Sequence, residues 1–118
     1  MASLVERLRA QREFWVPLDE AKPQGLRVRL IRPQETGMHK LLLGLDAAKL
    51  AEHTTGWDGF SDADLIGAAL GSSDPLPFDA SAWAEVLADR ADWFGVLAKA
   101  MQDAIVKHLE ARDAASKN

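Results

Sequence analysis

Apolar residues near the N-terminus have the spacing of one short helix. Three of them fall on a single helical face: Leu4, Val5 and Leu8. Ser3 and Glu6 have the spacing of a capping box, in which each side chain accepts a hydrogen bond from the other residue's backbone N–H. We therefore expect a helix over residues 3–12.

Two strand-like runs follow this helix. Residues 14–18 form a compact aromatic and β-branched run, and residues 26–31 alternate between apolar and basic side chains. This alternation is typical of a half-buried strand, with Leu26, Val28 and Leu30 facing inward and Arg27 and Arg29 facing water. The two runs predict a β-hairpin with a long loop over 19–25. Two strands alone are marginal, so the hairpin has to lean on helices or pair with another chain.

The middle of the chain returns to a helical spacing. We expect Pro33 as the first residue of this helix and Glu35 in its first turn, where the helix dipole favours an anion. The apolar stripe of the helix consists of Met38, Leu41, Leu42, Leu45 and Ala48. Gly44, followed by Asp46, is expected to split the helix in two, and the helix should end at 54–55.

Residues 54–65 combine two large aromatic side chains with glycines and aspartates. The glycines suit a loop with unusual backbone angles, and Trp57 and Phe60 have enough apolar area to hold that loop against a core. Ser61 and Asp64 have the spacing of an Asp variant of the capping box. We expect a packed loop between helices, followed by two further segments: a short helix over 61–69 and a loop over 71–77.

Two more helices are expected before the C-terminus. Asp79 or Ser81 caps the first, which breaks near 89–92. Its apolar residues are Trp83, Val86 and Leu87. The second helix is expected over 91–111, with an apolar stripe of Phe94, Leu97, Met101, Ile105 and Leu109.

These elements predict a mainly α (α+β) fold, in which an N-terminal β-hairpin packs on a bundle of about four to five helices. A chain of 118 residues has the length of one domain. We expect four segments within it: an N-terminal helix at 1–13, the hairpin at 14–32, a helical part at 33–112 and a frayed tail at 113–118.

Composition excludes several classes of protein. No run approaches the roughly 18 apolar residues of a membrane span, and the N-terminus lacks the apolar core of a signal peptide. The net charge of −4 argues against a nucleic-acid surface, because phosphate binding needs clustered Lys and Arg. The absence of cysteine excludes disulfides and suits a reducing cytosol. We expect a soluble cytoplasmic protein that binds neither membrane nor nucleic acid.

Basic residues nevertheless gather in the first third of the chain. They are Arg7, Arg9, Arg12, Arg27, Arg29 and Arg32. This bias indicates either a cationic face for an acidic protein partner or an ordinary solvated surface.

The chain has no recognisable catalytic or metal-binding motif. His39, His53 and His108 lack the spacing of metal ligands. The aspartates at 58, 62 and 64 resemble the start of an acidic metal loop but lack the order of an EF-hand, so capping and turn roles explain them better. No phosphate-binding or nucleophile motif is present, and the segment 89–92 is expected to be a helix junction with an ion pair. We expect no enzyme activity, no cofactor and no metal.

Four tryptophans are a heavy aromatic load for this small chain: Trp15, Trp57, Trp83 and Trp93. They either fill the core or lie at a subunit or partner interface, where tryptophan is enriched. Our candidate interface residues are Arg27, Arg29, Trp57, Phe60, Trp83 and Trp93.

Three blocks of the sequence, taken in order, resemble the tail assembly chaperones of long-tailed bacteriophages and prophages. The blocks are the hairpin exit Val28–Pro33, the aromatic segment Gly56–Leu65, and Pro75–Trp83 continuing to Leu87–Trp93. The similarity extends over about residues 14–118, and the second and third blocks are its specific part.

The resemblance implies a non-catalytic protein of the host cytoplasm that is absent from the mature virion. Such proteins hold the long helical tape-measure protein soluble and help the tail-tube protein polymerise around it. The chaperone would also associate with itself, through the edge of residues 26–31 and the stripe of the last helix. Such proteins are typically made in a short form and, by programmed slippage, a longer one; the ending Ser116-Lys117-Asn118 predicts an A-rich slippery run in the gene.

Two alternatives stay open. The first is another small phage morphogenesis protein, such as a head–tail connector or a minor tail protein. The second is a helix-turn-helix DNA-binding regulator built from the last two helices. A recognition helix ought to be basic, whereas the charges of residues 91–112 are balanced. Three acidic residues, Asp92, Asp103 and Glu110, stand against three basic ones, Lys99, Lys107 and Arg112.

Overall fold

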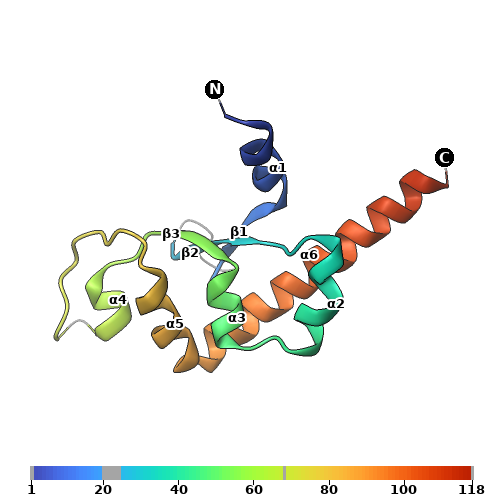
Figure 1. Cartoon of the computed structure of the whole chain (residues 1–118). Helices are drawn as coiled ribbons and strands as arrows, with labels where there is room; N and C mark the ends of the chain where they lie inside the picture. Colours follow the sequence, from blue (N-terminus) through green and yellow to red (C-terminus); the bar gives the residue numbers. More distant parts are fainter. Residues whose placement is uncertain (1, 20–24, 68, 118) are drawn as a thin grey trace.

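A computed structural model of the chain describes residues 2–19, 25–67 and 69–117. Within these ranges the chain forms six helices and a three-stranded antiparallel sheet (Figure 1). The elements are α1 (Leu4–Arg12), β1 (Glu13–Pro17), β2 (Arg27–Ile31), α2 (Glu35–Leu43), α3 (Ala47–Glu52), β3 (Thr54–Asp58), α4 (Asp62–Ile66), α5 (Ala80–Ala88) and α6 (Ala91–Ser116). The predicted mixed and mostly helical fold class is confirmed.

The predicted hairpin is present as β1 and β2. Its register pairs Val16 with Val28 and Phe14 with Leu30, so the apolar residues of both strands share one face. Residues 20–24, in the middle of the predicted hairpin loop, lie outside the described residues. The hairpin gains its support in two ways: from helices on its apolar face and from a third strand along β2.

The prediction of a loop between two helices in this region was wrong in its first half, because Thr54–Asp58 forms β3. β3 pairs antiparallel with β2, with an irregularity between Arg29 and Leu30. Threonine and tryptophan favour strands, and the second edge of β2 needs hydrogen-bond partners. The glycine and aspartates of this segment masked that preference at the sequence level.

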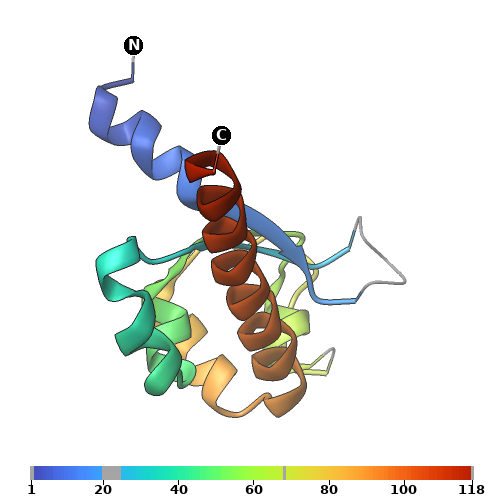
Figure 2. The same cartoon turned by 90° about the vertical axis from the view of Figure 1, so that its right-hand side faces the viewer.

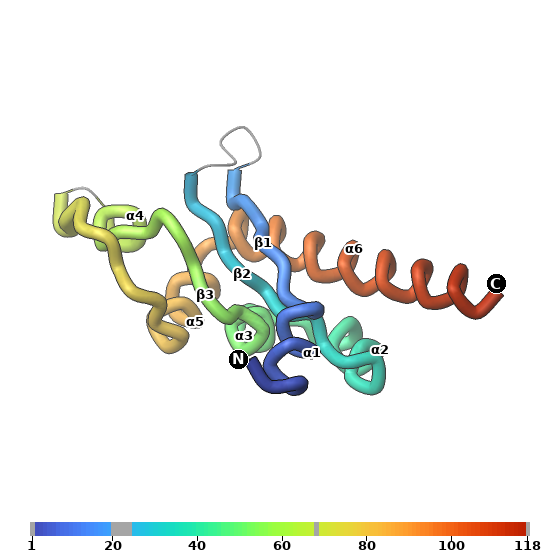
Figure 3. The backbone as a smooth tube through the Cα atoms, turned by 90° about the horizontal axis from the view of Figure 1, so that it is seen from above, coloured from blue at the N-terminus to red at the C-terminus, as the bar shows by residue number. Residues whose placement is uncertain are grey.

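The core lies between the sheet and the helices α3, α5 and α6, which pack on the same face of the sheet (Figures 1 and 3). Val28 and Leu30 contribute the sheet side and are fully buried. The helical side is provided by Leu50, Trp83, Leu87, Leu97, Met101 and Ile105. The apolar stripes predicted for the last two helices therefore belong to this core, except for Leu109, which is exposed.

Several helix boundaries were predicted correctly. Ser3 caps α1 by accepting the Glu6 N–H at 3.1 Å, and Asp79 caps α5 by accepting the Ala82 N–H at 3.1 Å. The Asp64 carboxylate reaches back to the Ser61 N–H at 2.8 Å at the start of α4. The split near Gly44 is also present, between α2 and α3.

Two helix ends differ from the prediction. α2 begins at Glu35 with Gln34 as its N-cap, rather than at Pro33. The predicted frayed tail is helical as far as Ser116, so that α6 has 26 residues. An ion pair between Asp113 and Lys117 at 3.0 Å and a pair of alanines favour this last turn.

Candidate protein-binding surfaces

Five aromatic side chains form one cluster inside the molecule. They are Trp57, Phe60, Phe78, Trp83 and Trp93. The Trp57 and Phe60 rings stack with centroids 4.8 Å apart, the Trp83 and Trp93 rings stack at 6.0 Å, and edge-to-face contacts connect the two pairs. The cluster joins β3 and the segment after it to α5 and α6, so these aromatic residues hold the layers together.

The polar ends of two of these tryptophans are satisfied inside the fold. Trp83 Nε1 donates to Thr54 Oγ1 at 3.2 Å, and Trp57 Nε1 donates to the Leu76 carbonyl at 2.9 Å. Among the candidate interface residues, Phe60, Trp83 and Trp93 are core residues whose side chains are buried. Trp57 keeps part of its surface exposed.

Trp15 is the most exposed of the four tryptophans, with 43% of its surface in contact with solvent. It lies on the sheet face opposite the core, between the guanidinium groups of Arg27 and Arg29, which are 4.9 and 5.6 Å from its ring centroid. Sequence reasoning did not select Trp15. The alternation of β1, which turns Phe14 and Val16 inward, was the signal that places it outside.

The two arginines of this face are both neutralised by carboxylates. Arg27 pairs with Asp58, and Arg29 Nε lies 2.9 Å from Glu13 Oε2. These exposed and half-exposed pairs compensate the local charge, so this part of the predicted cationic face is not free to attract an acidic partner.

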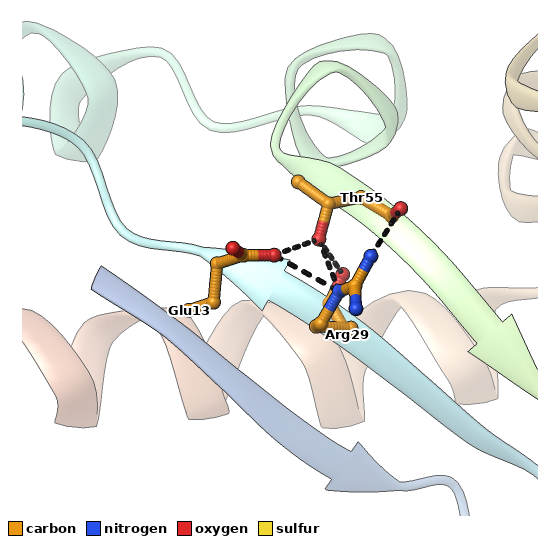
Figure 4. A network of polar contacts seen from close by, with 3 residues as sticks. All are labelled: Glu13, Arg29 and Thr55. Atoms are coloured by element: carbon orange, nitrogen blue, oxygen red, sulfur yellow. Dashed lines mark hydrogen bonds and ion pairs between the residues drawn. The ribbon is translucent and has the colours of Figure 1, made fainter. Parts of the chain in front are cut away.

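A hydrogen-bonded network ties all three strands together on the same face (Figure 4). The Thr55 hydroxyl donates to Glu13 Oε2 at 2.8 Å and accepts from Arg29 Nε at 2.8 Å, while Arg29 Nη2 donates to the Thr55 carbonyl at 3.0 Å. Gly56 makes room for this arrangement, because an added Cβ would lie 3.2 Å from Arg29 Nη2. The arginine can therefore lie flat across β3.

An open groove runs between β1 and residues 100–111 of α6, with a volume of about 580 Å³. Its apolar lining consists of Phe14, Trp15, Val16, Pro17, Ala100, Ala104 and Ala111. Its charged lining is mostly basic: Arg12, Arg32 and Lys107 against Glu13 and Asp103. Partial burial, and then the neighbouring Arg12, lower the pKa of Arg32, as expected where like charges lie close together. We call this feature the β1–α6 groove.

A second groove lies between α4 and the beginning of α5, with a volume of about 610 Å³. Its apolar lining consists of Trp57, Leu65, Ile66, Leu76, Pro77, Phe78, Ala80 and Ala82. Its charged lining is acidic, from Asp62 and Asp79. We call this feature the α4–α5 groove. The two grooves are thus similar in volume and opposite in charge.

Two charge clusters hold the ends of α6. Arg90 lies 3.7 Å from the centroid of the Trp93 ring and hydrogen-bonds Asp92, which lowers the pKa of Asp92 to about 2. This is the helix junction with an ion pair that was predicted for 89–92. Further along α6, His108 and then Arg112 hydrogen-bond Glu35 and lower its pKa. The second cluster fastens the start of α2 to α6.

Most of the aspartates and histidines considered as metal ligands have separate structural partners. Asp62 accepts from the Ser72 hydroxyl at 3.4 Å, and His53 Nδ1 is 2.9 Å from the Lys49 carbonyl. Within the described residues, no three His, Asp or Glu side chains are grouped as a metal site would require. In the same part of the chain, no helix has the length and apolar character needed to cross a membrane.

The surfaces predicted for self-association are not available in the expected form. Residues 26–31 were predicted to form a sheet edge available for self-association. In the fold they form β2, which is the central strand and pairs on both sides. Leu97, Met101 and Ile105 of the α6 stripe are buried in the core, and Leu109 alone of the five is exposed. The sequence did not show that a third strand would occupy the second edge of β2.

Comparisons with protein-family models, with curated proteins and with solved structures found no match to this chain.

Proposed function

We propose that this protein is a non-enzymatic phage tail assembly chaperone that binds the tape-measure protein and helps the tail-tube protein assemble around it. The resemblance of residues 56–65 and 75–93 to such chaperones supports the proposal. The structural observation that carries it is the β1–α6 groove, an open groove with apolar walls and a mostly basic charged lining.

The β1–α6 groove has the properties of a binding site for a helix. Ala100 and Ala104 are one helical turn apart on α6, and their small side chains allow a partner helix to approach closely. Phe14 and Val16 of β1 form the opposite wall. An extended tape-measure helix without its tube exposes apolar side chains that would aggregate, and this groove could cover them in short stretches.

The charge of the groove specifies the partner further. Arg12, Arg32 and Lys107 outnumber Glu13 and Asp103, so the groove favours an apolar stripe flanked by acidic residues. One groove of this size gives modest affinity, and several copies acting together would raise it by multivalency. In this proposal the chaperone acts in the host cytoplasm and leaves before the virion is complete.

Co-expression with the tape-measure protein from the same gene cluster tests the proposal. The chaperone should increase the soluble fraction of the tape-measure protein. Ala104→Glu places a bulky anion in the groove and should abolish the increase. Gln102→Glu adds the same charge to an exposed position of α6 outside the groove lining and should leave it intact. Circular dichroism establishes that both variants are folded.

The tape-measure role is refuted if the wild-type chain leaves the solubility of the tape-measure protein unchanged. Detection of the chain in purified virions would favour the alternative, a head–tail connector or a minor tail protein, because a chaperone of this kind leaves the assembly.

A further inference from the structure

The apolar side chains of the first helix are not covered by the rest of the described residues. Leu4, Val5 and Leu8 are exposed over 63%, 66% and 51% of their surfaces, and α1 has no buried residue. Figures 1 and 2 show α1 standing away from the body of the molecule. An apolar stripe of this kind on a capped helix indicates a surface that becomes covered by another polypeptide.

The helix is also basic. Arg7, Arg9 and Arg12 flank the stripe, and Glu6 is the single acidic residue of α1. A complementary surface would therefore combine an apolar channel with acidic edges.

The α4–α5 groove has this combination. Its floor is apolar, and Ile66, which lines it, is exposed over 58% of its surface. The sequence around it is entirely acidic in its charges: between His53 and Arg90 there is no Lys, Arg or His. The acidic residues of this stretch are Asp58, Asp62, Asp64, Asp74, Asp79, Glu85 and Asp89.

We propose that α1 of one copy docks into the α4–α5 groove of a second copy. The β1–α6 groove would bind α1 less well than the α4–α5 groove, because Arg12, Arg32 and Lys107 would repel a basic helix. Docking within one copy is excluded by the connection: α1 ends at Arg12, β1 begins at Glu13, and the Glu13 N–H donates to the Ala10 carbonyl. No linker is available to swing α1 to α4, which lies at another end of the molecule (Figure 3).

The docked geometry uses two different surfaces of the same chain. Each copy then offers one α1 and one groove, so the contact is head-to-tail and can continue from copy to copy. The assembly closes into a ring or continues as a spiral, depending on the rotation between neighbours. α1 is about 13 Å long, so each contact is small and the assembly should depend on concentration.

Sedimentation velocity over a range of concentrations tests the docking, and no tail component is needed. The wild-type chain should form larger species as its concentration rises, and added salt should weaken them. Leu8→Glu in α1 and Ile66→Glu in the groove should each reduce the association constant by at least about tenfold. Leu43→Glu is the matched control, because Leu43 is 76% exposed on α2 and lines neither groove, and it should assemble as the wild type does.

Mixing the two defective variants gives the decisive result. The Leu8→Glu chain retains an intact groove and the Ile66→Glu chain retains an intact α1, so the mixture should form a one-to-one heterodimer that grows no further. The inference is overturned if the wild-type chain stays monomeric at every concentration, if Ile66→Glu assembles normally, or if the mixture forms no heterodimer. None of these outcomes decides whether a single β1–α6 groove binds the tape-measure protein, so the two proposals fail separately.

Discussion

Replacing Thr54 with valine tests whether Trp83 is a core residue whose polar end the fold must satisfy. Trp83 is fully buried, and its Nε1 donates to Thr54 Oγ1 at 3.2 Å. Thr54 Oγ1 in turn donates to the Leu50 carbonyl at 2.7 Å. Valine keeps the shape of threonine and removes the hydroxyl, so the indole N–H is left buried without an acceptor.

The expected loss of stability follows from these contacts. A buried donor without a partner costs about 1–3 kcal/mol. The Leu50 carbonyl still accepts a hydrogen bond from the His53 N–H at 3.1 Å, so losing the Thr54 hydroxyl there adds little to that cost. The methyl group of valine that replaces the hydroxyl is buried, and its burial stabilises the fold by about 0.8 kcal/mol. We therefore expect Thr54→Val to lower the free energy of unfolding by about 0.2–2 kcal/mol.

A double-mutant cycle separates this effect from a general disturbance of the core. Trp83→Phe removes the indole N–H, so Thr54→Val should be nearly neutral in that background, and the coupling should be about 1 kcal/mol or more. Urea unfolding followed by far-UV circular dichroism measures all four proteins, with Thr36→Val as an exposed control. If the two substitutions are additive within about 0.3 kcal/mol, the hydrogen bond does not contribute as argued.

Two further predictions concern Gly71 and Gly95, and the loss of stability at acid pH. Gly71→Ala should destabilise the protein by about 1–3 kcal/mol, because the new Cβ would lie 2.5 Å from the Ala63 backbone nitrogen, whereas Gly95→Ala meets open space among the described residues and should stabilise α6 by about 0.5–1 kcal/mol. Urea midpoints that move in the same direction for both variants would contradict this reading. The Arg90 contact lowers the pKa of Asp92 from 3.8 to about 2, so its stabilising effect is present above pH 3.8 and is lost as the pH falls through about 2. Asp92→Asn should therefore lose less stability than the wild type over that range, and parallel pH profiles of the urea midpoint would refute the assignment.

Local patterns were sufficient for much of the secondary structure. Ser3, Asp64 and Asp79 reveal helix starts because capping is a contact between residues three positions apart. The alternation of residues 26–31 indicates a strand because neighbouring side chains of a strand point to opposite faces. The β3 strand was missed because its reason to form is the second edge of β2, which is distant in sequence.

The candidate surfaces were less accessible to sequence reasoning. Trp57, Trp83, Trp93 and Trp15 are the same residue type, and their different exposure follows from which elements pack against each of them. Likewise, Arg27 and Arg29 indicate a cationic face in the sequence, whereas pairing with Asp58 and Glu13 neutralises them in the fold. The carboxylates come from other strands, so no local sequence pattern predicts these ion pairs.

The sequence by itself determined the helices, the hairpin, the mixed fold class and the apolar stripe of α1, because each depends on residues within a few positions of one another. Only the tertiary structure decided which aromatic residues are buried, which charges are compensated and where two oppositely charged grooves open. Those features arise where separate elements meet, and the contacts between distant residues are formed only when the chain folds.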